Sequence, residues 1–384
     1  MPLANALLTE DQLSQPEETY PLDLVFCRSC SLLQITETVP PEQLFREYLY
    51  FSSFSDTMLR HAETLVEQLI ESRDLGGSSQ VVEVASNDGY LLQFYARAGI
   101  PTLGIEPAEN VARVAREERG VPTIGEFFGL ELANRLVSDD VRADVLHAHN
   151  VLAHVSDLNG FVAGIERLLA PGGIAVIEVP YVKDMLDRCE FDTVYHEHLC
   201  YFSATSLSRL FGRHGLSAED VERVPVHGGS LRLNIGRGKP GSRVQRMLEE
   251  EARWGVDDVD TYRAFGERVE RLKHSLRETL QGVKRGGARV AAYGAAAKGS
   301  TLLNCFHIGP ETLEFVVDRS THKQGRYMPG VHLPIYAPEK LLEERPDYVL
   351  LLTWNLADEI LEQQEAYRRA GGKFIVPVPE PYIV

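Results

Sequence analysis

The sequence predicts an α/β protein in which a small N-terminal domain precedes two parallel-sheet domains. Its 384 residues give room for two or three domains of roughly 100 to 200 residues each. From residue 61 onward, β-branched strand patterns alternate with amphipathic helical patterns, and the alternation starts again after a long charged stretch. Strands and helices in this rhythm form parallel sheets with helices on both faces. We therefore expect domains at 1–60, 61–236 and 237–384.

Composition excludes several other classes. Hydrophobic residues make up 44% and charged residues 25%, which rules out a disordered or collagenous chain. The 39 Lys and Arg against 56 Asp and Glu give a net charge of −17, which argues against broad binding to nucleic acid or to an anionic membrane. The first residues lack a basic region, and no apolar run approaches the roughly 20 residues of a membrane helix. With scattered cysteines that form no disulfide framework, we expect a cytoplasmic protein that is neither exported nor membrane-spanning.

Residues 1–60 show little periodicity and end in an aromatic run. A unit this small needs a staple or a neighbour to be stable. Cys27 and Cys30 form a CxxC pair whose thiolates can bind zinc, but a closed structural site takes four ligands and the sequence has no second CxxC.

The first parallel-sheet domain follows from residue 61. The expected helices are 61–72, 90–99, 109–120, 130–140 and 158–173, and the expected strands are 80–86, 101–107, 121–125, 143–150 and 174–182. The rhythm lapses over 184–215, where an insertion in such a sheet commonly forms a lid over the ligand crevice.

A charged amphipathic stretch over 244–286 leads to the second parallel-sheet domain. The expected strands there are 289–295, 313–320, 347–354 and 373–379, and the expected helices are 298–307, 338–346 and 356–372. The repeated rhythm indicates a second doubly wound sheet.

The turn after the first strand predicts a ligand crevice. In VVEVASNDGY, Glu83 lies in the strand, and Asn87, Asp88 and Gly89 form the turn before a helix. The GxGxxG fingerprint is absent, but Glu106 lies about 20 residues further on, where an acid accepts hydrogen bonds from ribose hydroxyls. This pattern favours a nucleoside cofactor over NAD. The alternative is that these acids only cap turns and helices.

A second group of polar residues follows later strands. His149, Asn150 and His154 lie near the same carboxyl edge of the predicted sheet. The segment EFDTVYHEHLCYF then places Tyr195, His196, Glu197 and His198 side by side. An imidazole there can act as a general base because it titrates near neutral pH. If the segment is extended, His196 and His198 point the same way and form a two-His metal edge, and a purely structural role is the third alternative.

Two glycine-containing segments predict anion binding. In VHGGSLR, His227, Ser230 and Arg232 flank two glycines, so that the backbone can approach a ligand and the arginine can hold a phosphate, although an ordinary hairpin is the alternative. In AAYGAAAKGSTLLN, Lys298, Ser300 and Thr301 open a helix whose N-terminus favours a diphosphate. The following DRSTHKQG adds Arg319, Lys323 and Gln324. The lysine precedes its glycine, so this is not a Walker A loop.

Recognisable segments span the whole chain: PLANALL, CRSCSLLQ, YLYFSSFS, VVEVASNDGYLLQ, GIEPAENVA, NVLAHVSDLNGFV, FDTVYHEHLCYFS, HGGSLR, AAYGAAAKGSTLLN and VVDRSTHKQG. In this order they resemble the S-adenosylmethionine (SAM)-dependent C-methyltransferases that act on nucleotide-linked keto-deoxysugars in antibiotic sugar biosynthesis. The resemblance implies a zinc-binding N-terminal domain, a Rossmann-like methyltransferase domain and a Rossmann-like C-terminal domain, with the sugar nucleotide held between the last two. It also implies a CxxC before PLAN, which this sequence does not contain.

The resemblance further implies methyl transfer to a ring carbon of a dTDP-linked sugar, C3 in the first place and C5 as the alternative. We also expect the protein to be a monomer. His198 is then the base, Glu197 orients it or relays protons, Tyr195 contacts the enolate or keto oxygen, and Tyr50 closes the pocket. The residues implied to bind SAM are Glu83, Ala85, Asn87, Asp88, Gly89, Glu106, Pro107, Asn150 and His154. Those implied to bind the substrate are His196, His227, Ser230, Arg232, Lys298, Ser300, Arg319, Lys323 and Gln324, and those for zinc are Cys27 and Cys30. The alternatives are an NAD-using or non-catalytic Rossmann protein, and methyl transfer to oxygen or nitrogen.

Overall fold

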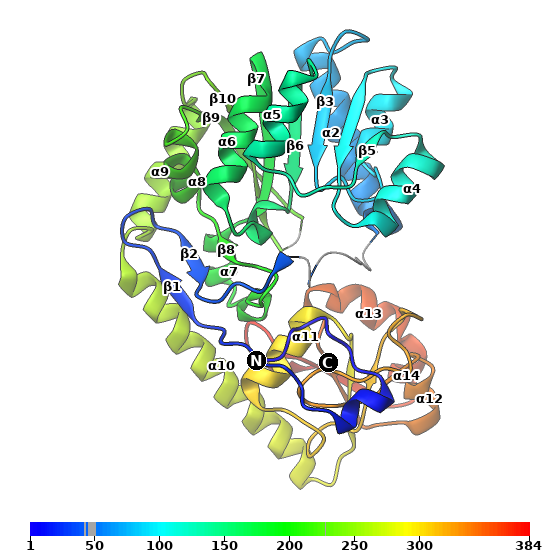
Figure 1. The fold of residues 1–384 in the computed structure, drawn as a ribbon. Coiled ribbons are helices and arrows are strands. Elements are labelled where there is room, and N and C mark those ends of the chain that lie inside the picture. The colour runs from blue at the N-terminus through cyan, green and yellow to red at the C-terminus, as the bar shows by residue number, and fades with distance from the viewer. Residues whose placement is uncertain (42–43, 45–50, 227) are drawn as a thin grey trace.

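The computed structural model describes residues 1–41, 44, 51–226 and 228–384, and within these ranges the chain forms three sheets (Figure 1). The sheets belong to a small N-terminal part, a central α/β part and a C-terminal α/β part, so the α/β fold class is confirmed. No helix in the described ranges is both long and apolar enough to cross a membrane.

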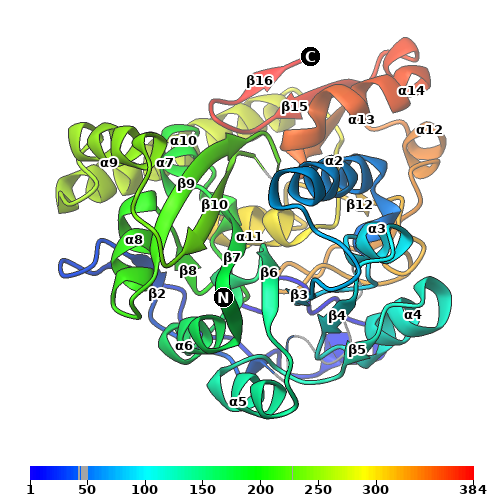
Figure 2. The ribbon, with the colours of Figure 1, turned by 90° about the horizontal axis from the view of Figure 1, so that it is seen from above.

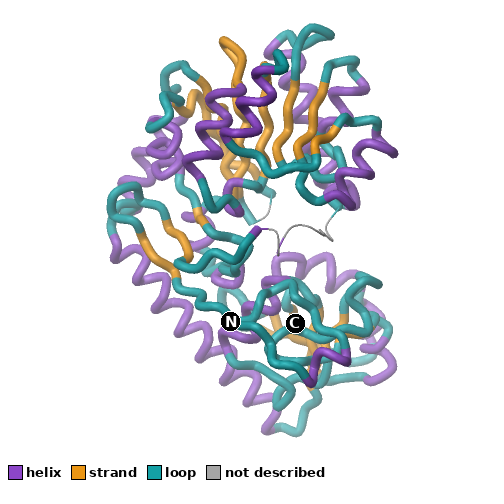
Figure 3. The backbone as a smooth tube through the Cα atoms, viewed as in Figure 1, coloured by secondary structure: helices purple, strands orange, loops and turns teal. Residues whose placement is uncertain are grey.

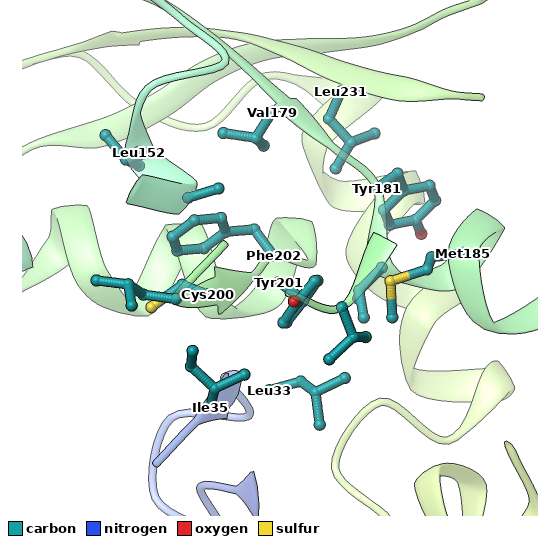
Figure 4. Packing of buried hydrophobic residues seen from close by; sticks show 14 of the residues in the cluster. Leu33, Ile35, Leu152, Val179, Tyr181, Met185, Cys200, Tyr201, Phe202 and Leu231 are labelled. Atoms are coloured by element: carbon teal, nitrogen blue, oxygen red, sulfur yellow. The ribbon is translucent and has the colours of Figure 1, made fainter. Parts of the chain in front are cut away.

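The N-terminal part consists mostly of loop (Figure 3). A 3-10 helix, η1 (Glu10–Ser14), precedes the antiparallel pair β1 (Leu24–Phe26) and β2 (Leu33–Ile35). The third strand of this sheet is β8 (Cys200–Tyr201), which comes from the insertion between β7 and β9 of the central part. Leu33 and Ile35 pack with the buried side chains of the insertion (Figure 4). The N-terminal part therefore shares its core with the insertion.

The central sheet has seven strands in the order β5-β4-β3-β6-β7-β10-β9, of which β9 and β10 are antiparallel to their neighbours. Figure 2 shows α2 on one face of this sheet and α5 and α6 on the other. The strands are β3 (Val81–Val84), β4 (Thr102–Ile105), β5 (Thr123–Ile124), β6 (Ala143–His149), β7 (Leu169–Pro180), β9 (Ser217–Val224) and β10 (Ser230–Gly236). The helices are α2 (Asp56–Arg73), α3 (Leu92–Arg97), α4 (Glu109–Arg119), α5 (Leu130–Ser138), α6 (Leu158–Leu168), α7 (Val182–Asp187) and α8 (Ala204–Gly212), with the 3-10 turns η2 (Ser52–Phe54), η3 (Leu152–His154) and η4 (Phe191–Thr193).

One predicted boundary in this sheet is wrong. We expected a helix as far as residue 173, but α6 ends at Leu168 and β7 begins at Leu169. Pro171 lacks a backbone N–H, and Gly172 adopts a φ of 79°, so neither residue fits a helix. These residues instead shift the register of β7 against β6.

The C-terminal sheet has six strands in the order β13-β12-β11-β14-β15-β16, all parallel except β16. The strands are β11 (Val290–Tyr293), β12 (Val316–Val317), β13 (Ile335–Tyr336), β14 (Tyr348–Leu351), β15 (Lys373–Val376) and β16 (Tyr382–Ile383). The helices are α11 (Ala297–Phe306), α12 (Lys340–Glu344), α13 (Ala357–Gln363) and α14 (Glu365–Arg369), with the 3-10 turn η5 (Trp354–Leu356).

Two helices join the two α/β parts. The amphipathic stretch expected over 244–286 is divided into α9 (Ser242–Trp254) and α10 (Val259–Arg285). The division falls at Gly255, whose left-handed φ of 94° ends α9. Helix α10 runs along the side of the molecule between the two parts (Figure 1).

The first 20 residues lie on the C-terminal part. Leu8 and Tyr327 exchange backbone hydrogen bonds of 3.0 and 2.9 Å, and Glu17 accepts hydrogen bonds from Gly330 and pairs with His332. The segment also contacts the insertion after β7, where Asn5 donates to Glu197 and the Pro21 carbonyl accepts from His196. The N-terminal segment thus contacts both the C-terminal part and the residues around β8.

Candidate active site

The turn that follows β3 forms the first part of the site. Ala85, Asn87 and Gly89 all adopt positive φ values, of 55°, 49° and 75°, which gives the turn its sharp curvature. The Glu106 carboxylate, at the end of β4 and just before Pro107, accepts backbone N–H groups of Asn87 and Ala108 at 2.9 Å each. Burial raises the pKa of Glu106 to about 7, although these two hydrogen bonds oppose the shift. The predicted strand, turn and acid are therefore brought together.

Several buried acceptors around this turn have no hydrogen-bond partner among the described residues: Glu83 Oε2, Asp88 Oδ1 and Asn150 Oδ1. Burial raises the pKa of Glu83 well above its usual range, and the nearby Asp88 and Glu106 add to the shift. Unsatisfied buried acceptors are costly unless a ligand donates to them. Acidic oxygens in this arrangement fit a ligand that carries an ammonium group and ribose hydroxyls, as SAM does.

A turn between η4 and β8 forms the second part of the site. The extended conformation that would align His196 with His198 is not present, because the backbone N–H of His198 closes a turn onto the Tyr195 carbonyl at 2.8 Å. The buried His196 instead donates from Nε2 to the Pro21 carbonyl at 3.0 Å. The two imidazoles thus do not form a metal edge, and no cluster of three or more His, Cys, Asp or Glu side chains suited to a metal occurs in the described ranges.

The surroundings of His198 determine its tautomer. Nδ1 lies 2.8 Å from the Thr193 carbonyl oxygen, which can only accept, so Nδ1 carries the proton. In the neutral ring Nε2 then has a lone pair, and the Tyr195 hydroxyl lies 3.1 Å from it. This tautomer is the one that a general base acting through Nε2 requires.

Glu197 and His154 lie beside His198 in this region. The half-buried Glu197 side chain accepts a hydrogen bond from Asn5 Nδ2 at 2.6 Å, and desolvation raises the pKa of its carboxyl. His154, on η3, donates from Nδ1 to the Glu197 carbonyl at 2.6 Å, and its ring lies 5.0 Å from that of His198. Burial lowers the pKa of His154 to about 4, so this ring is neutral near pH 7. Asn5 was not predicted from the sequence, because its partner is distant in the chain.

Arg232 binds two carboxylates of the protein, whereas the sequence suggested that it contacts a phosphate. Its Nε donates to Glu178 at 2.5 Å and its Nη1 to Glu222 at 2.6 Å, and 9% of the residue is exposed. Ser230 is likewise engaged, because its hydroxyl donates to the Val226 carbonyl at 3.0 Å. Protein acceptors thus occupy both side chains. His227 and Tyr50 lie outside the described residues.

Glu178 also belongs to a buried polar chain that sequence reasoning missed. The Tyr95 hydroxyl lies 3.0 Å from His147, which lies 3.0 Å from His149, which in turn lies 3.3 Å from Glu178. The two-residue spacing of the histidines in β6 was the available signal, because it places both on one face of the strand. Burial raises the pKa of Glu178, but His149, His61 and Arg232 outweigh it and hold the pKa well below its usual range.

The third part of the site lies in the C-terminal part, where Lys298 is in the first turn of α11. Its ammonium lies 3.6 Å from Glu190 and 5.1 Å from the centre of the Trp354 ring. Ser300 is buried, and its hydroxyl has no partner among the described residues. Lys298 and Ser300 thus lie together at a helix N-terminus beside the insertion.

The other predicted anion-binding residues hold the neighbouring loop. Lys323 donates to the Ala295 carbonyl at 2.8 Å, and Gln324 donates to the Asp318 carbonyl at 2.9 Å. Arg319 is exposed and lies 3.9 Å from Glu359. These three side chains therefore have protein partners in this structure.

Cys27 and Cys30 lie in the turn between β1 and β2 as free thiols. Hydrogen bonds, first from the Cys30 backbone, lower the pKa of Cys27, whereas burial raises the pKa of Cys30. Two thiolates are half of the set that a closed zinc site needs. The residues described here do not by themselves make up such a site.

Comparisons with known proteins cover the whole chain. Family models match at 1–45 ("Putative zinc binding domain"), 56–221 ("Methyltransferase domain") and 225–379 ("C-methyltransferase C-terminal domain"). The C-methyltransferase NovU of Streptomyces niveus is 38% identical, over 100% of this chain and 92% of NovU. A ubiquinone biosynthesis O-methyltransferase of a Methylobacterium species is 26% identical over 41% of this chain and 67% of its own. The crystal structure of magnesium protoporphyrin IX methyltransferase from Synechocystis PCC 6803 with bound SAM, 14% identical, covers 47% of this chain and 79% of its own with a TM-score of 0.37.

Proposed function

Because the chain belongs to the SAM-dependent C-methyltransferases, we propose that it methylates the ring carbon beside the ketone of a dTDP-linked keto-deoxysugar, C3 in the first place. The His198 tautomer is the observation that carries the proposal. A carbon beside a ketone becomes nucleophilic only after it loses a proton, so the reaction needs a base whose lone pair can accept that proton. Nε2 of His198 meets this need, because the Thr193 carbonyl holds the ring proton on Nδ1.

The residues of the chain have separate roles in this reaction. His198 Nε2 takes the proton from the sugar carbon, and the Tyr195 hydroxyl, now 3.1 Å from Nε2, turns to the oxygen that gains negative charge. Glu197, held by Asn5, keeps the turn in place. When bound, SAM supplies an electrophilic methyl group. Glu106, Asn87, Asp88, Glu83 and Asn150 orient it, and Lys298 with the α11 N-terminus receives the diphosphate.

Hydrogen exchange at the sugar carbon tests this function. In deuterium oxide without SAM, we expect the protein to introduce deuterium beside the ketone of a dTDP-keto-deoxysugar faster than in a sample without protein. With SAM, the methyl group should appear at the same carbon, as seen by NMR and mass spectrometry across a panel of such sugars. Methyl transfer to oxygen or nitrogen, without protein-dependent exchange, would refute the proposal.

Replacing Glu106 by Gln is expected to weaken SAM binding about 10- to 100-fold, because a hydrogen bond to a charged group contributes about 1.5 to 3 kcal/mol. The amide cannot accept from two backbone N–H groups and two ribose hydroxyls at once. Isothermal calorimetry measures the affinity. The matched control is Glu109→Gln, an exposed acid in the first turn of α4, which should change affinity less than about twofold. Equal affinity in the two variants would remove Glu106 from the cofactor site.

A further inference from the structure

One hydrogen bond connects the C-terminal part to the turn that contains His198. Trp354, on η5 directly after β14, donates its indole N–H to Asp192 Oδ2 at 2.6 Å. Asp192 lies on η4 and is fully buried. Its Oδ1 has no partner among the described residues, and the indole N–H is the side-chain donor that Oδ2 accepts from. Removal of a donor to a buried carboxylate is costly, which makes the bond a constraint on the geometry of η4.

The next residue along the chain holds the imidazole. The Thr193 carbonyl accepts the Nδ1 proton of His198 at 2.8 Å, and the Tyr201 hydroxyl lies 3.4 Å from the same oxygen. A change in the direction of this carbonyl would therefore alter both the orientation and the tautomer of His198. Asp192 and Thr193 are adjacent residues of one short 3-10 turn, so a shift of the Asp192 side chain can be passed to the Thr193 carbonyl through the backbone that joins them.

The same region of the C-terminal part carries the candidate diphosphate site. Lys298 lies over the Trp354 ring, with its ammonium 5.1 Å from the ring centre. The rings of Phe191 on η4 and Phe306 on α11 stack with centres 4.5 Å apart and planes 10° apart. Helix α11, η5 and η4 thus pack as one unit across the boundary between the two α/β parts.

We propose that Trp354 and Asp192 are positioning residues for His198, so that the C-terminal part contributes to proton abstraction as well as to nucleotide binding. This inference rests on the proposed function, in which His198 is the base. The bond acts through the Thr193 carbonyl, and neither side chain needs to touch the reacting carbon. Its loss should lower the rate of deprotonation and leave the binding of both ligands nearly unchanged.

Trp354→Phe tests the inference, because it removes the N–H and keeps an aromatic ring under Lys298. We expect kcat for methyl transfer and the SAM-free deuterium exchange rate to fall about tenfold or more. KM for the sugar nucleotide and Kd for dTDP should change less than twofold. The matched control is Trp254→Phe. The Trp254 ring also lies under a lysine, Lys183, and its indole N–H donates to the surface residue Asp187. This variant should leave kcat, the exchange rate, KM and Kd unchanged.

Variants of Asp192 provide a second test of the inference. Asp192→Asn retains an acceptor oxygen and should keep most of the activity, whereas Asp192→Leu should match Trp354→Phe, and the two losses should not add in the double variant. Exchange by Trp354→Phe at the wild-type rate would overturn the inference while the proposed function stands. A rise in KM alone would also overturn it, by making Trp354 a nucleotide contact. Absence of exchange in the wild type would refute the proposed function and this inference with it. If Trp354→Phe is unfolded at the assay temperature, the Asn and Leu variants decide.

Discussion

The His198→Asn variant is expected to lose carbon deprotonation by a factor of about 100 to 10,000, the usual contribution of general acid-base catalysis. Asparagine can still donate a hydrogen bond toward the Thr193 carbonyl, but its amide has no basic nitrogen to replace Nε2. Methyl transfer should fall with deuterium exchange, because both need the same carbanion. The affinity for SAM should stay nearly intact, since the residues proposed to bind it lie on β3 and in the loops that follow β3, β4 and β6.

Two quantities are measured for this variant: the rate of the chemical step and the affinity for SAM. Single-turnover kinetics and exchange report the chemical step, and calorimetry reports SAM binding. The control is His214→Asn, a surface imidazole 3.2 Å from Asn159, which should behave as the wild type. If His198→Asn still exchanges the sugar proton at the wild-type rate, another group is the base. If SAM affinity falls together with the rate, the turn has a structural role instead.

The alternation of strands and helices could be predicted because each element is encoded by a short run of neighbouring residues. Most of the parallel strands and the helices between them were expected near their places, whereas α7, α8, β9, β10, β13 and β16 were not expected. The boundary error at α6 came from reading Pro171 and Gly172 as the end of a helix rather than as part of a strand. The turn after β3 and its distance to Glu106 are also local signals. Periodicity and turn residues report such features directly.

Contacts between distant segments had no such signal. β8 completes a sheet with strands more than 160 residues earlier, Asn5 reaches Glu197, and Trp354 reaches Asp192 from the far part of the chain. Arg232 was read as a phosphate ligand because it follows two glycines, but its strand register places it opposite Glu178 and Glu222. Register and interdomain packing decide these partners, and neither is visible in a window of neighbouring residues.

Replacing Arg232 by Met is expected to destabilise the central part by about 3 to 5 kcal/mol, because it leaves a buried carboxylate without its closest cationic partner, 2.5 Å away. Glu178 has 1% of its side chain exposed and Arg232 has 10%. Methionine fills a similar volume, so the loss of stability comes from the missing charge rather than from a cavity. Urea unfolding, followed by circular dichroism, measures the change in the free energy of unfolding.

The surface offers a matched control in Arg243→Met. Arg243 pairs with Asp220, but the two side chains are 54% and 30% exposed, so solvent screens the pair and its loss should cost less than about 1 kcal/mol. If the Arg232 variant is no less stable than this control, the buried pair contributes nothing to folding. The double variant Arg232→Met, Glu178→Gln should recover part of the loss, because it removes the unpaired charge as well.

The pH dependence distinguishes this electrostatic origin from lost packing. Since the folded pKa of Glu178 is held below its unfolded value of 4.5, the ionised group stabilises the wild type above that pH, and the contribution is lost as pH falls through the folded pKa. In Arg232→Met that contribution is reduced, because burial then opposes ionisation with one cation fewer nearby. The difference in unfolding free energy between wild type and variant should therefore be largest near neutral pH and narrow below about pH 4.5, as long as the native state persists. A difference that is constant from pH 7 to pH 4 would assign the effect to packing and leave the ion pair without a role in stability.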